Sequence, residues 1–334
     1  MKRSGMTRRT WLAWMGVVPL ATWLAPRRVR AGWFDALFPT PARTTPAITP
    51  TKDFYVTSCC STPRPPKSEH WSLTVKGLVE HPITLRYEDL LARPAVREIV
   101  TLECIGNPVG GDSIGTAEWG GIRLADLLRE AGVAHGAVDL VMRAADGYSD
   151  SFPIRRALES DVLIAYTMNG EPLPRNHGYP ARIIVPGIYG MKHVKWLTEL
   201  EVVNEDYQGY WEQRGWSDEA LIRLRSRIDA PGDGERVPVG AFTVRGIAFG
   251  GRSPAGRVEV STDGGRSWEA ASLTPPLSPH AWTLWSHPWR IPRPGSYVLA
   301  VRAVDGTGAV QSADAGAPFP SGASGLHAVR VTAA

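Results

Sequence analysis

The sequence predicts an α+β domain followed by an all-β, immunoglobulin-like sandwich. A chain of 334 residues, of which 43% are hydrophobic and 13 are tryptophan, is long enough to bury two cores. Helical and strand patterns are mixed up to about residue 230, whereas only short segments of alternating hydrophobicity follow Val237. Pro231-Gly232-Asp233-Gly234 interrupts the pattern, so the first domain is predicted to span residues 51–232 and the sandwich residues 233–334.

Residues 1–31 are predicted to be an export signal. They carry seven basic residues and no acidic one, and the apolar run Trp11–Ala25 lies between the basic groups. Thr7–Leu12 places paired arginines directly before this run and resembles the twin-arginine signal, which is read by an export receptor. We expect cleavage after Ala31 and a periplasmic or otherwise exported protein; a retained anchor is the alternative. Residues 32–50, rich in Pro, Thr and Ala, are predicted to be a linker.

Removal of the signal changes the formal charge of the chain from +4 to about −3. The mature chain has no basic patch of the kind that binds nucleic acid, and no polybasic stretch suited to a membrane surface. We therefore expect no nucleic-acid partner.

Within the first domain, strand patterns alternate with helical ones. Four apolar residues between Leu124 and Ala131 share one helical face, and Gly132 is placed to cap the C-terminus of that helix. Pro186-Gly187 is a turn signal after a buried-strand pattern. The predicted elements are strands around Leu73–Val75 and Ile83–Leu85, helices at Ile122–Ala131 and Ile154–Leu158, and a strand at Ala181–Pro186.

The predicted strands of the sandwich are short and separated by Gly and Pro. They are Phe242–Phe249, Arg257–Ser261, Trp282–Trp285, Tyr297–Ala303 and His327–Thr332. Asp263-Gly264-Gly265 predicts a tight hairpin turn between two of these strands. Trp282, Trp285 and Trp289 form either an exposed cluster at an interface or part of the core.

The three cysteines are too few for the disulfide framework of a small secreted domain. Cys59 and Cys60 are neighbours, and a disulfide between neighbours demands strained geometry, so we expect two ordinary thiols. In Thr101–Asn107, Cys104 ends an apolar run and is followed by residues that turn. A thiolate in a loop is a strong, soft metal ligand that leaves room for a bulky cofactor on its open side. A small buried side chain is the alternative for Cys104.

Four separated motifs resemble the sulfite oxidase family of molybdopterin-dependent oxidoreductases, over most of residues 50–330. In chain order they are Cys104–Asn107 (Cys-Ile-Gly-Asn), Trp119–Leu128, Asp161–Arg182 and Val185–Trp196. Val258–Trp268 in the sandwich is similar to the dimerisation domain of that family. The resemblance implies a sulfite-oxidase-type molybdopterin-binding domain with one Mo-molybdopterin per chain. It also implies a homodimer, and Cys104 as the protein's ligand to the metal.

The resemblance further implies which residues bind the cofactor. His177, Arg182 and Lys195 correspond to the family's anchoring His, Arg and Lys, which suit a pterin that ends in a phosphate. Tyr55–Cys59 corresponds to a strand that passes the cofactor, and Asp146 to an acidic position; a simple Asp-Gly turn is the alternative for Asp146. The predicted cofactor-binding residues are Tyr55, Val56, Thr57, Ser58, Cys59, Cys104, Asp146, His177, Arg182, His193, Val194 and Lys195.

The sequence departs from true sulfite oxidases at the positions that bind the sulfite anion. Their first arginine corresponds to Thr57 and their second to Val109. No Arg or Lys lies in residues 303–329, where the third is expected. The family's active-site tyrosine corresponds to Trp216. Because each charge-assisted hydrogen bond contributes about 1.5 to 3 kcal/mol, we predict that sulfite is not the substrate. The predicted catalytic residues are Cys104, Thr57, Val109 and Trp216.

Together these features predict an exported molybdenum enzyme that performs two-electron oxygen-atom transfer on a small substrate other than sulfite. The chain has no haem-attachment motif Cys-x-x-Cys-His, so we expect no haem. Electrons are then exchanged with a separate carrier such as a c-type cytochrome. Two alternatives stay open: a sulfite dehydrogenase whose anion site is rebuilt from other residues, and a non-catalytic binding or assembly subunit that keeps the fold.

Overall fold

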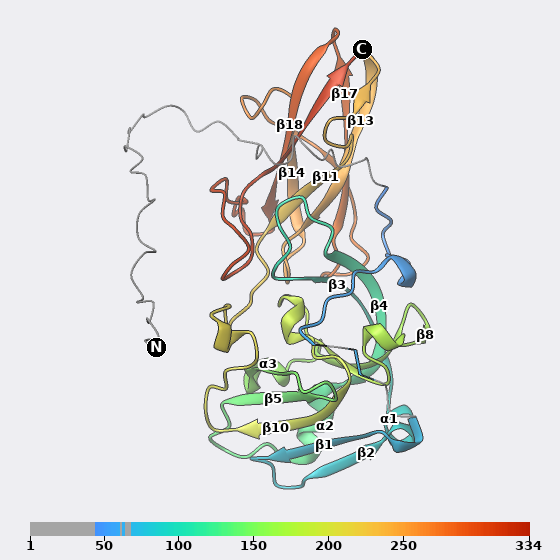
Figure 1. The fold of residues 1–334 in the computed structure, drawn as a ribbon, viewed down its shortest axis with the longest axis vertical. Helices are drawn as coiled ribbons and strands as arrows, with labels where there is room; N and C mark the ends of the chain where they lie inside the picture. The colour runs from blue at the N-terminus through green and yellow to red at the C-terminus, as the bar shows by residue number, and fades with distance from the viewer. Residues whose placement is uncertain (1–43, 61, 64–67) are drawn as a thin grey trace, which may run out of the picture.

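The computed structural model describes residues 44–60, 62–63 and 68–334. The predicted signal and most of the predicted linker lie outside these residues. The described chain forms an N-terminal unit and a C-terminal unit, each with two β-sheets (Figure 1). No helix in the described part of the chain has the length and apolar character needed to cross a membrane.

The N-terminal unit consists of short strands and short helices. Its strands are β1 (Ser72–Gly77), β2 (Ile83–Arg86), β3 (Val96–Glu103), β4 (Ile114–Arg123), β5 (Asp139–Ala144), β6 (Ser149–Pro153), β7 (Leu163–Met168), β8 (Glu171–Pro172), β9 (Arg182–Ile184) and β10 (Leu197–Val203). Its α-helices are α1 (Tyr87–Leu91), α2 (Leu124–Ala131) and α3 (Ile154–Ala157). Its 3-10 helices are Thr51–Asp53, Ser68–His70, Arg175–His177, Gly190–Lys192 and Glu212–Arg214.

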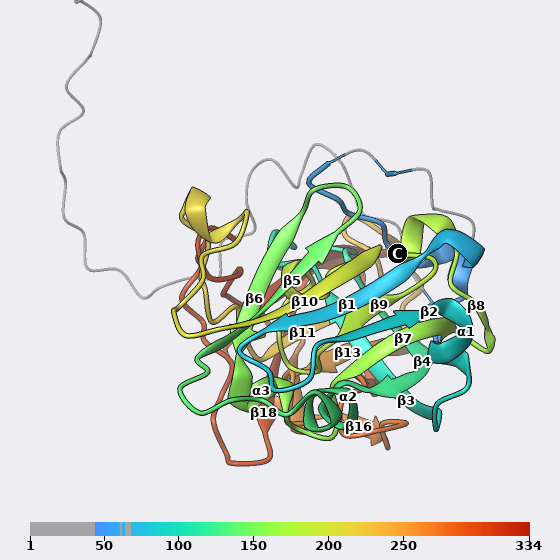
Figure 2. The same cartoon turned by 90° about the horizontal axis from the view of Figure 1, so that it is seen from below.

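Two sheets form the framework of this unit. In the first, the strand order is β2-β1-β10-β5-β6, and β1 and β10 run parallel although more than a hundred residues separate them (Figure 2). In the second, the order is β3-β4-β7-β8, with β9 paired to β7. Aliphatic side chains of α2 and of the first sheet pack in one large buried cluster, which anchors the loops between the sheets.

The predicted elements of the first domain form, with shifted bounds. Helix α2 begins at Leu124 rather than Ile122, because Ile122 and Arg123 continue β4 and pair with β7. Gly132 caps the helix as predicted, with a left-handed φ of 69° that a side chain would disfavour.

The C-terminal unit is built from strands alone. They are β11 (Arg225–Ala230), β12 (Arg236–Val237), β13 (Gly240–Phe249), β14 (Ala255–Ser261), β15 (Glu269–Ala270), β16 (Ser272–Thr274), β17 (Thr283–Ile291), β18 (Gly295–Asp305) and β19 (His327–Ala333). One sheet has the order β11-β13-β17-β16 and the other β12-β19-β18-β14-β15. Their apolar faces share a second buried cluster that includes Val258, Leu299 and Val331.

Two predictions for this unit need correction, and one open alternative is decided. Strand β11 precedes the predicted boundary at 232/233 but pairs with β13, so the sheet begins before the Pro-Gly segment that suggested the boundary. Trp282, Trp285 and Trp289 are all buried, which decides between the two alternatives in favour of the core. The turn at Asp263 is not a tight hairpin. It occupies residues 262–268 between β14 and β15, where the Asp263 carboxylate accepts N–H groups of Arg266 and Ser267.

The two units are joined by buried polar contacts at β3. The Thr101 N–H donates to the carbonyl of His280 (2.9 Å), and the Trp282 N–H donates to the Thr101 hydroxyl (2.8 Å). The Trp282 indole packs in the core cluster of the N-terminal unit. Since β3 leads directly to Cys104, these contacts fix the C-terminal unit close to the loop that carries the cysteine.

Candidate active site

Cys104 follows β3 and begins the loop that leads to β4. Its backbone N–H donates to Ser113 O (3.0 Å), and its carbonyl accepts the N–H of Asn107 (2.9 Å). The buried Asn107 side chain donates to Glu103 Oε1 (2.7 Å) and accepts the Ser113 N–H (3.1 Å). The loop is therefore fixed by its own polar groups, which hold the Cys104 thiol in one position.

Cys104 lines a cavity of about 260 Å³ in the N-terminal unit. Every predicted cofactor-binding residue lines the same cavity, and so does Trp216. The structure thus brings together side chains from position 54 to position 216. Sequence reasoning missed the rest of the wall: Phe54, Leu102, Ile105, Gly106, Tyr148, Asn176, Gly190, Met191, Trp196 and Trp211.

Val109 lies elsewhere. Two successive turns, from Cys104 to Asn107 and from Pro108 to Gly111, carry the loop past the first cavity. Val109 instead lines a second cavity, between the loop and the C-terminal unit. The prediction that Val109 lines the Cys104 cavity is wrong. Its distance from Cys104 along the sequence does not determine the direction in which the loop turns.

The cavity gathers basic side chains that are removed from water. Burial lowers the pKa of Arg182 to about 10. Burial, followed by the positive charge of Arg182, lowers the pKa of His193 to about 3, of His177 to about 4 and of Lys195 to about 7. The lowered pKa values mean that the protonated forms of these groups are disfavoured in the free protein. An anion bound among them would stabilise the protonated forms and would itself be stabilised.

Arg182 has no acidic partner among the described residues. Its guanidinium donates to the carbonyls of His177 (3.0 Å) and His193 (3.2 Å) and lies 5.0 Å from the ring centre of Trp119. Its Nε is buried without a hydrogen-bond partner. A buried cation left unpaired costs several kcal/mol, so this arrangement fits the anionic group of a bound cofactor.

Cys104 belongs to no group of three or more His, Cys, Asp or Glu side chains that converge on one point, within the described ranges. A metal held by this thiol would therefore need most of its ligands from another molecule. The single thiol, the buried Arg182 guanidinium and the ring-lined wall all suit a phosphate-bearing organic cofactor that carries its own metal ligands.

The segment from Tyr55 to Cys60 passes the cavity without regular structure. Lys195 Nζ donates to Thr57 O (3.0 Å) and to the Ser58 hydroxyl (2.7 Å), which ties the segment to the cavity wall. Cys59 and Cys60 are joined in a disulfide, so the prediction of two ordinary thiols is wrong. Because no helix or strand constrains the backbone here, the chain is free to form the ring that joins neighbouring cysteines.

Asp146 forms the Asp-Gly turn that was the alternative prediction, and it also lies at the cavity. Its carboxylate accepts the Tyr148 N–H (3.0 Å) across a turn whose Gly147 has a φ of 85°. The same residue lines the cavity. His193 is held more firmly, since its Nε2 contacts the carbonyl of Ile188 (3.1 Å) deep in the unit.

A buried ionic cluster lies behind the aromatic part of the wall. The Lys192 ammonium donates to Asp150 (3.0 Å), Glu212 (2.8 Å) and Asp218 (3.0 Å), and the Tyr148 hydroxyl donates to Asp150 (2.6 Å). Because Glu212 and Asp218 flank Trp216, the cluster fixes that segment against the cavity. The sequence offered no signal for this role, since Lys192 stands among other basic residues in the same motif.

Comparison with known proteins agrees with this arrangement. Residues 61–211 match the model of the oxidoreductase molybdopterin binding domain, and residues 220–317 match the Mo-co oxidoreductase dimerisation domain. The chain is 32% identical to sulfite oxidase of Arabidopsis thaliana over 290 residues, which cover 72% of this chain and 74% of that protein. It is 36% identical to mitochondrial sulfite oxidase of Homo sapiens over 249 residues, covering 61% of this chain and 46% of the relative.

A solved structure supports the same assignment. The sulfane dehydrogenase SoxCD from Paracoccus pantotrophus superposes with a TM-score of 0.73 at 29% identity, over 79% of this chain and 74% of that chain. Fold, cavity and matches together define a molybdopterin-dependent oxidoreductase. The chain belongs to the sulfite oxidase family. It spans about half the length of the mammalian relatives that it matches.

Proposed function

We propose that this protein is an exported enzyme that transfers an oxygen atom between water and a small substrate other than sulfite. In the oxidising direction, the substrate and one water give the oxygenated product, two protons and two electrons. The electrons pass to a separate one-electron carrier such as a c-type cytochrome. Bound molybdopterin supplies the two-electron redox chemistry, while the chain supplies binding, orientation and exclusion of water.

The composition of the cavity wall carries this proposal. The basic residues His177, Arg182 and Lys195 are the ones that the family resemblance assigns to the cofactor. The position of the first sulfite-binding arginine is Thr57, which lines the same cavity as Trp211 and Trp216. A compact dianion needs several charged donors around it, whereas this wall suits a neutral or larger organic group.

Aromatic side chains at this part of the wall contact one another edge to face. Trp211 and Trp216 meet edge to face with ring centres 6.2 Å apart, and Trp216 meets Phe319 in the same way at 5.2 Å. Phe319 belongs to the C-terminal unit and does not line the cavity, so that unit contacts Trp216 from outside the wall. Trp211 and Trp216 offer apolar ring surface to a substrate.

Steady-state kinetics of the molybdenum-loaded protein test the proposal. We expect poor kcat/KM for sulfite and better values for one or more organic sulfides in a panel assayed with a cytochrome acceptor. Thr57→Arg should raise kcat/KM for sulfite because it restores one cation, while Thr243→Arg on the exposed part of β13 should leave it unchanged. A low-micromolar KM for sulfite with rapid cytochrome reduction in the wild type would refute the proposal.

Two further features belong to the proposal. The twin-arginine motif supports export, which sequencing of the mature N-terminus after expression in a host with that pathway would test. The strand order of the C-terminal unit, β11-β13-β17-β16 against β19-β18-β14-β15, supports an immunoglobulin-like sandwich that forms a homodimer. Light scattering of the purified mature chain measures the oligomeric state.

A further inference from the structure

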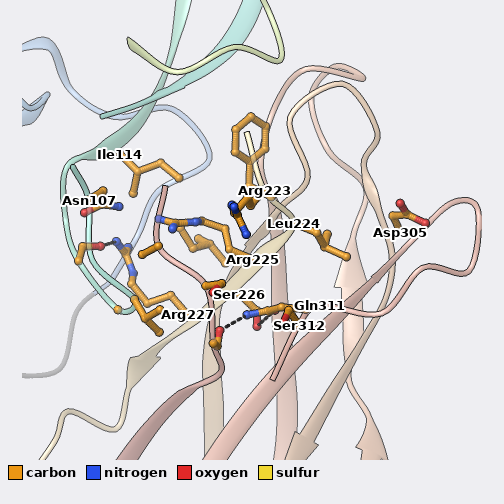
Figure 3. A pocket seen from close by; sticks show the side chains of 18 of the residues that line it. Asn107, Ile114, Arg223, Leu224, Arg225, Ser226, Arg227, Asp305, Gln311 and Ser312 are labelled. Carbon is orange, nitrogen blue, oxygen red and sulfur yellow. Dashed lines mark hydrogen bonds between the residues drawn. The ribbon is translucent and has the colours of Figure 1, made fainter. Parts of the chain in front are cut away.

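The second cavity has a volume of about 250 Å³ and lies between the Cys104 loop and the C-terminal unit (Figure 3). Asn107, Val109 and Gly111 form its wall on the loop side. Residues of segment 305–325 form part of the opposite wall. The cavity therefore joins two of the regions in which the sequence lacks the arginines of true sulfite oxidases.

Arginines from a different part of the chain enter this cavity. Arg223, Arg225 and Arg227 recur at every second position where the chain enters β11, and Figure 3 shows their side chains beside Asn107 and Ile114. Nothing in the spacing of the family motifs pointed to these residues, because only the tertiary structure brings β11 to the Cys104 loop.

Two of the three arginines are engaged by acidic groups. Arg227 donates to Asp229 (2.6 Å), to Gly111 O (2.8 Å) and to the Thr45 hydroxyl (3.2 Å). Arg225 forms an ion pair with the buried Glu103. Neither Asp229 nor Glu103 lines the cavity, so the counterions lie behind the guanidinium groups.

Arg223 is different, since among the described residues its side chain forms one hydrogen bond, from Nε to Ser321 O (2.8 Å). No carboxylate oxygen within the described part of the chain lies within 4.0 Å of its guanidinium. Asp305, the one acidic residue of the lining, stands across the cavity from Arg225 and Arg227 in Figure 3. Arg223 is exposed, and its terminal N–H groups donate to no acceptor among the described residues.

We infer that the second cavity binds a small organic monoanion, a carboxylate or sulfonate on an apolar body. The guanidinium of Arg223 carries one positive charge and no directly paired carboxylate among the described residues, and its planar fork matches two oxygens of such a group. The remaining wall includes Ile114, Leu224, Ile247 and Phe249. These side chains can pack against the apolar body but offer no hydrogen-bond donor to a compact inorganic dianion. The anion is either the charged end of the substrate or a separate effector.

Isothermal titration of the molybdenum-loaded protein with 1-propanesulfonate, without turnover, tests the inference. We expect saturable 1:1 binding that 1-propanol does not reproduce and that sulfate reproduces only more weakly. Arg223→Gln should weaken propanesulfonate binding by about tenfold or more, and Arg223→Lys by less, because lysine keeps the charge but loses the fork. Arg245→Gln, at an exposed position of β13, removes the same charge and should leave binding unchanged.

Absence of binding, equal affinity in Arg223→Gln and Arg245→Gln, or tighter binding of sulfate than of propanesulfonate would each overturn the inference. Inhibition by propanesulfonate against an organic sulfide substrate assigns the source: a competitive pattern supports the substrate's own anionic end, and a non-competitive pattern supports an effector. The titration involves no catalysis, so its outcome is independent of the proposed oxygen-atom transfer.

Discussion

The cores of the two units differ in what they bury. The N-terminal unit encloses ionisable side chains, among them Arg182, Lys192 and Glu212, whereas the hydrophobic cluster between the two C-terminal sheets consists of aliphatic and aromatic side chains. The buried charges of the C-terminal unit, Arg227 and Asp229, lie on β11, whose Arg227 reaches across to the Cys104 loop. Burying a charge costs several kcal/mol. A unit that buries many ionisable side chains is therefore the part of the molecule in which function, rather than stability, explains the choice of residues.

Cys104→Ser is expected to have the largest effect. The variant should lose activity but keep its stability. A hydroxyl is a poor ligand for a soft metal centre, so redox turnover should be abolished. One thiol-to-hydroxyl change in a loop seldom unfolds a domain, so the melting temperature should stay close to that of the wild type. Turnover assays, molybdenum analysis and thermal unfolding measure these quantities. Full turnover in the variant would show that Cys104 is not the ligand.

Lys192→Met should lower the free energy of unfolding by about 3 to 5 kcal/mol, because it leaves Asp150 and Glu212 buried without a counterion. Activity should fall as well, since the segment that carries Trp216 loses its anchor. Lys76→Met is the matched control: Lys76 pairs with Glu199 on the surface with its side chain 42% exposed, and the expected change is below about 1 kcal/mol. Urea unfolding compares the two variants. Equal losses would mean that the buried cluster contributes no more than a surface pair.

Leu299→Ala tests the C-terminal unit, where we expect a loss of stability without a loss of cofactor. Leu299 is fully buried in the apolar core of the C-terminal unit, and the cavity left behind should cost about 2 to 5 kcal/mol. Unlike Lys192→Met, this variant should keep wild-type activity in its folded fraction, with molybdenum and pterin at wild-type stoichiometry. Turnover assays with metal and pterin analysis of the folded fraction measure the difference. Loss of cofactor here would contradict the separation of roles between the units.

The smallest expected effect is a difference in pH dependence. Burial raises the pKa of Asp150 to about 7, against the opposing charge of Lys192. The folded state thus favours the protonated carboxyl, and this contribution to stability is full below about pH 4 and is lost as the pH rises through about 7. In the C-terminal unit, hydrogen bonds from Ser267 and Thr307 lower the pKa values of Asp263 and Asp305. Their contribution is therefore lost only as the pH falls below the usual carboxyl range.

Urea unfolding of the wild type and of Asp150→Asn between about pH 4 and pH 7 tests this difference. We expect the wild type to lose stability relative to the variant as the pH rises, because asparagine does not titrate. Parallel curves would show that Asp150 ionises equally readily in the folded and unfolded states.

The sequence by itself determined the local elements and the chemistry of the cofactor cavity. Periodicity predicted α2 and eight of the nineteen described strands, and the family motifs predicted a set of cofactor-binding residues that all line one cavity with Cys104. These predictions succeed because a motif keeps cofactor-contacting residues at fixed spacing within short segments. The signals for Gly132 and for the Pro186-Gly187 turn were equally local, since a backbone conformation depends on neighbouring residues.

Only the tertiary structure decided which segments meet. It moved Val109 to a second cavity, brought Arg223–Arg227 beside the Cys104 loop, and assigned β11 to the C-terminal sheet. It also singled out Lys192 from its basic neighbours by surrounding it with three carboxylates. The charge state and partners of a side chain depend on burial and on groups distant in sequence, and neither quantity is encoded in the residue type or its spacing.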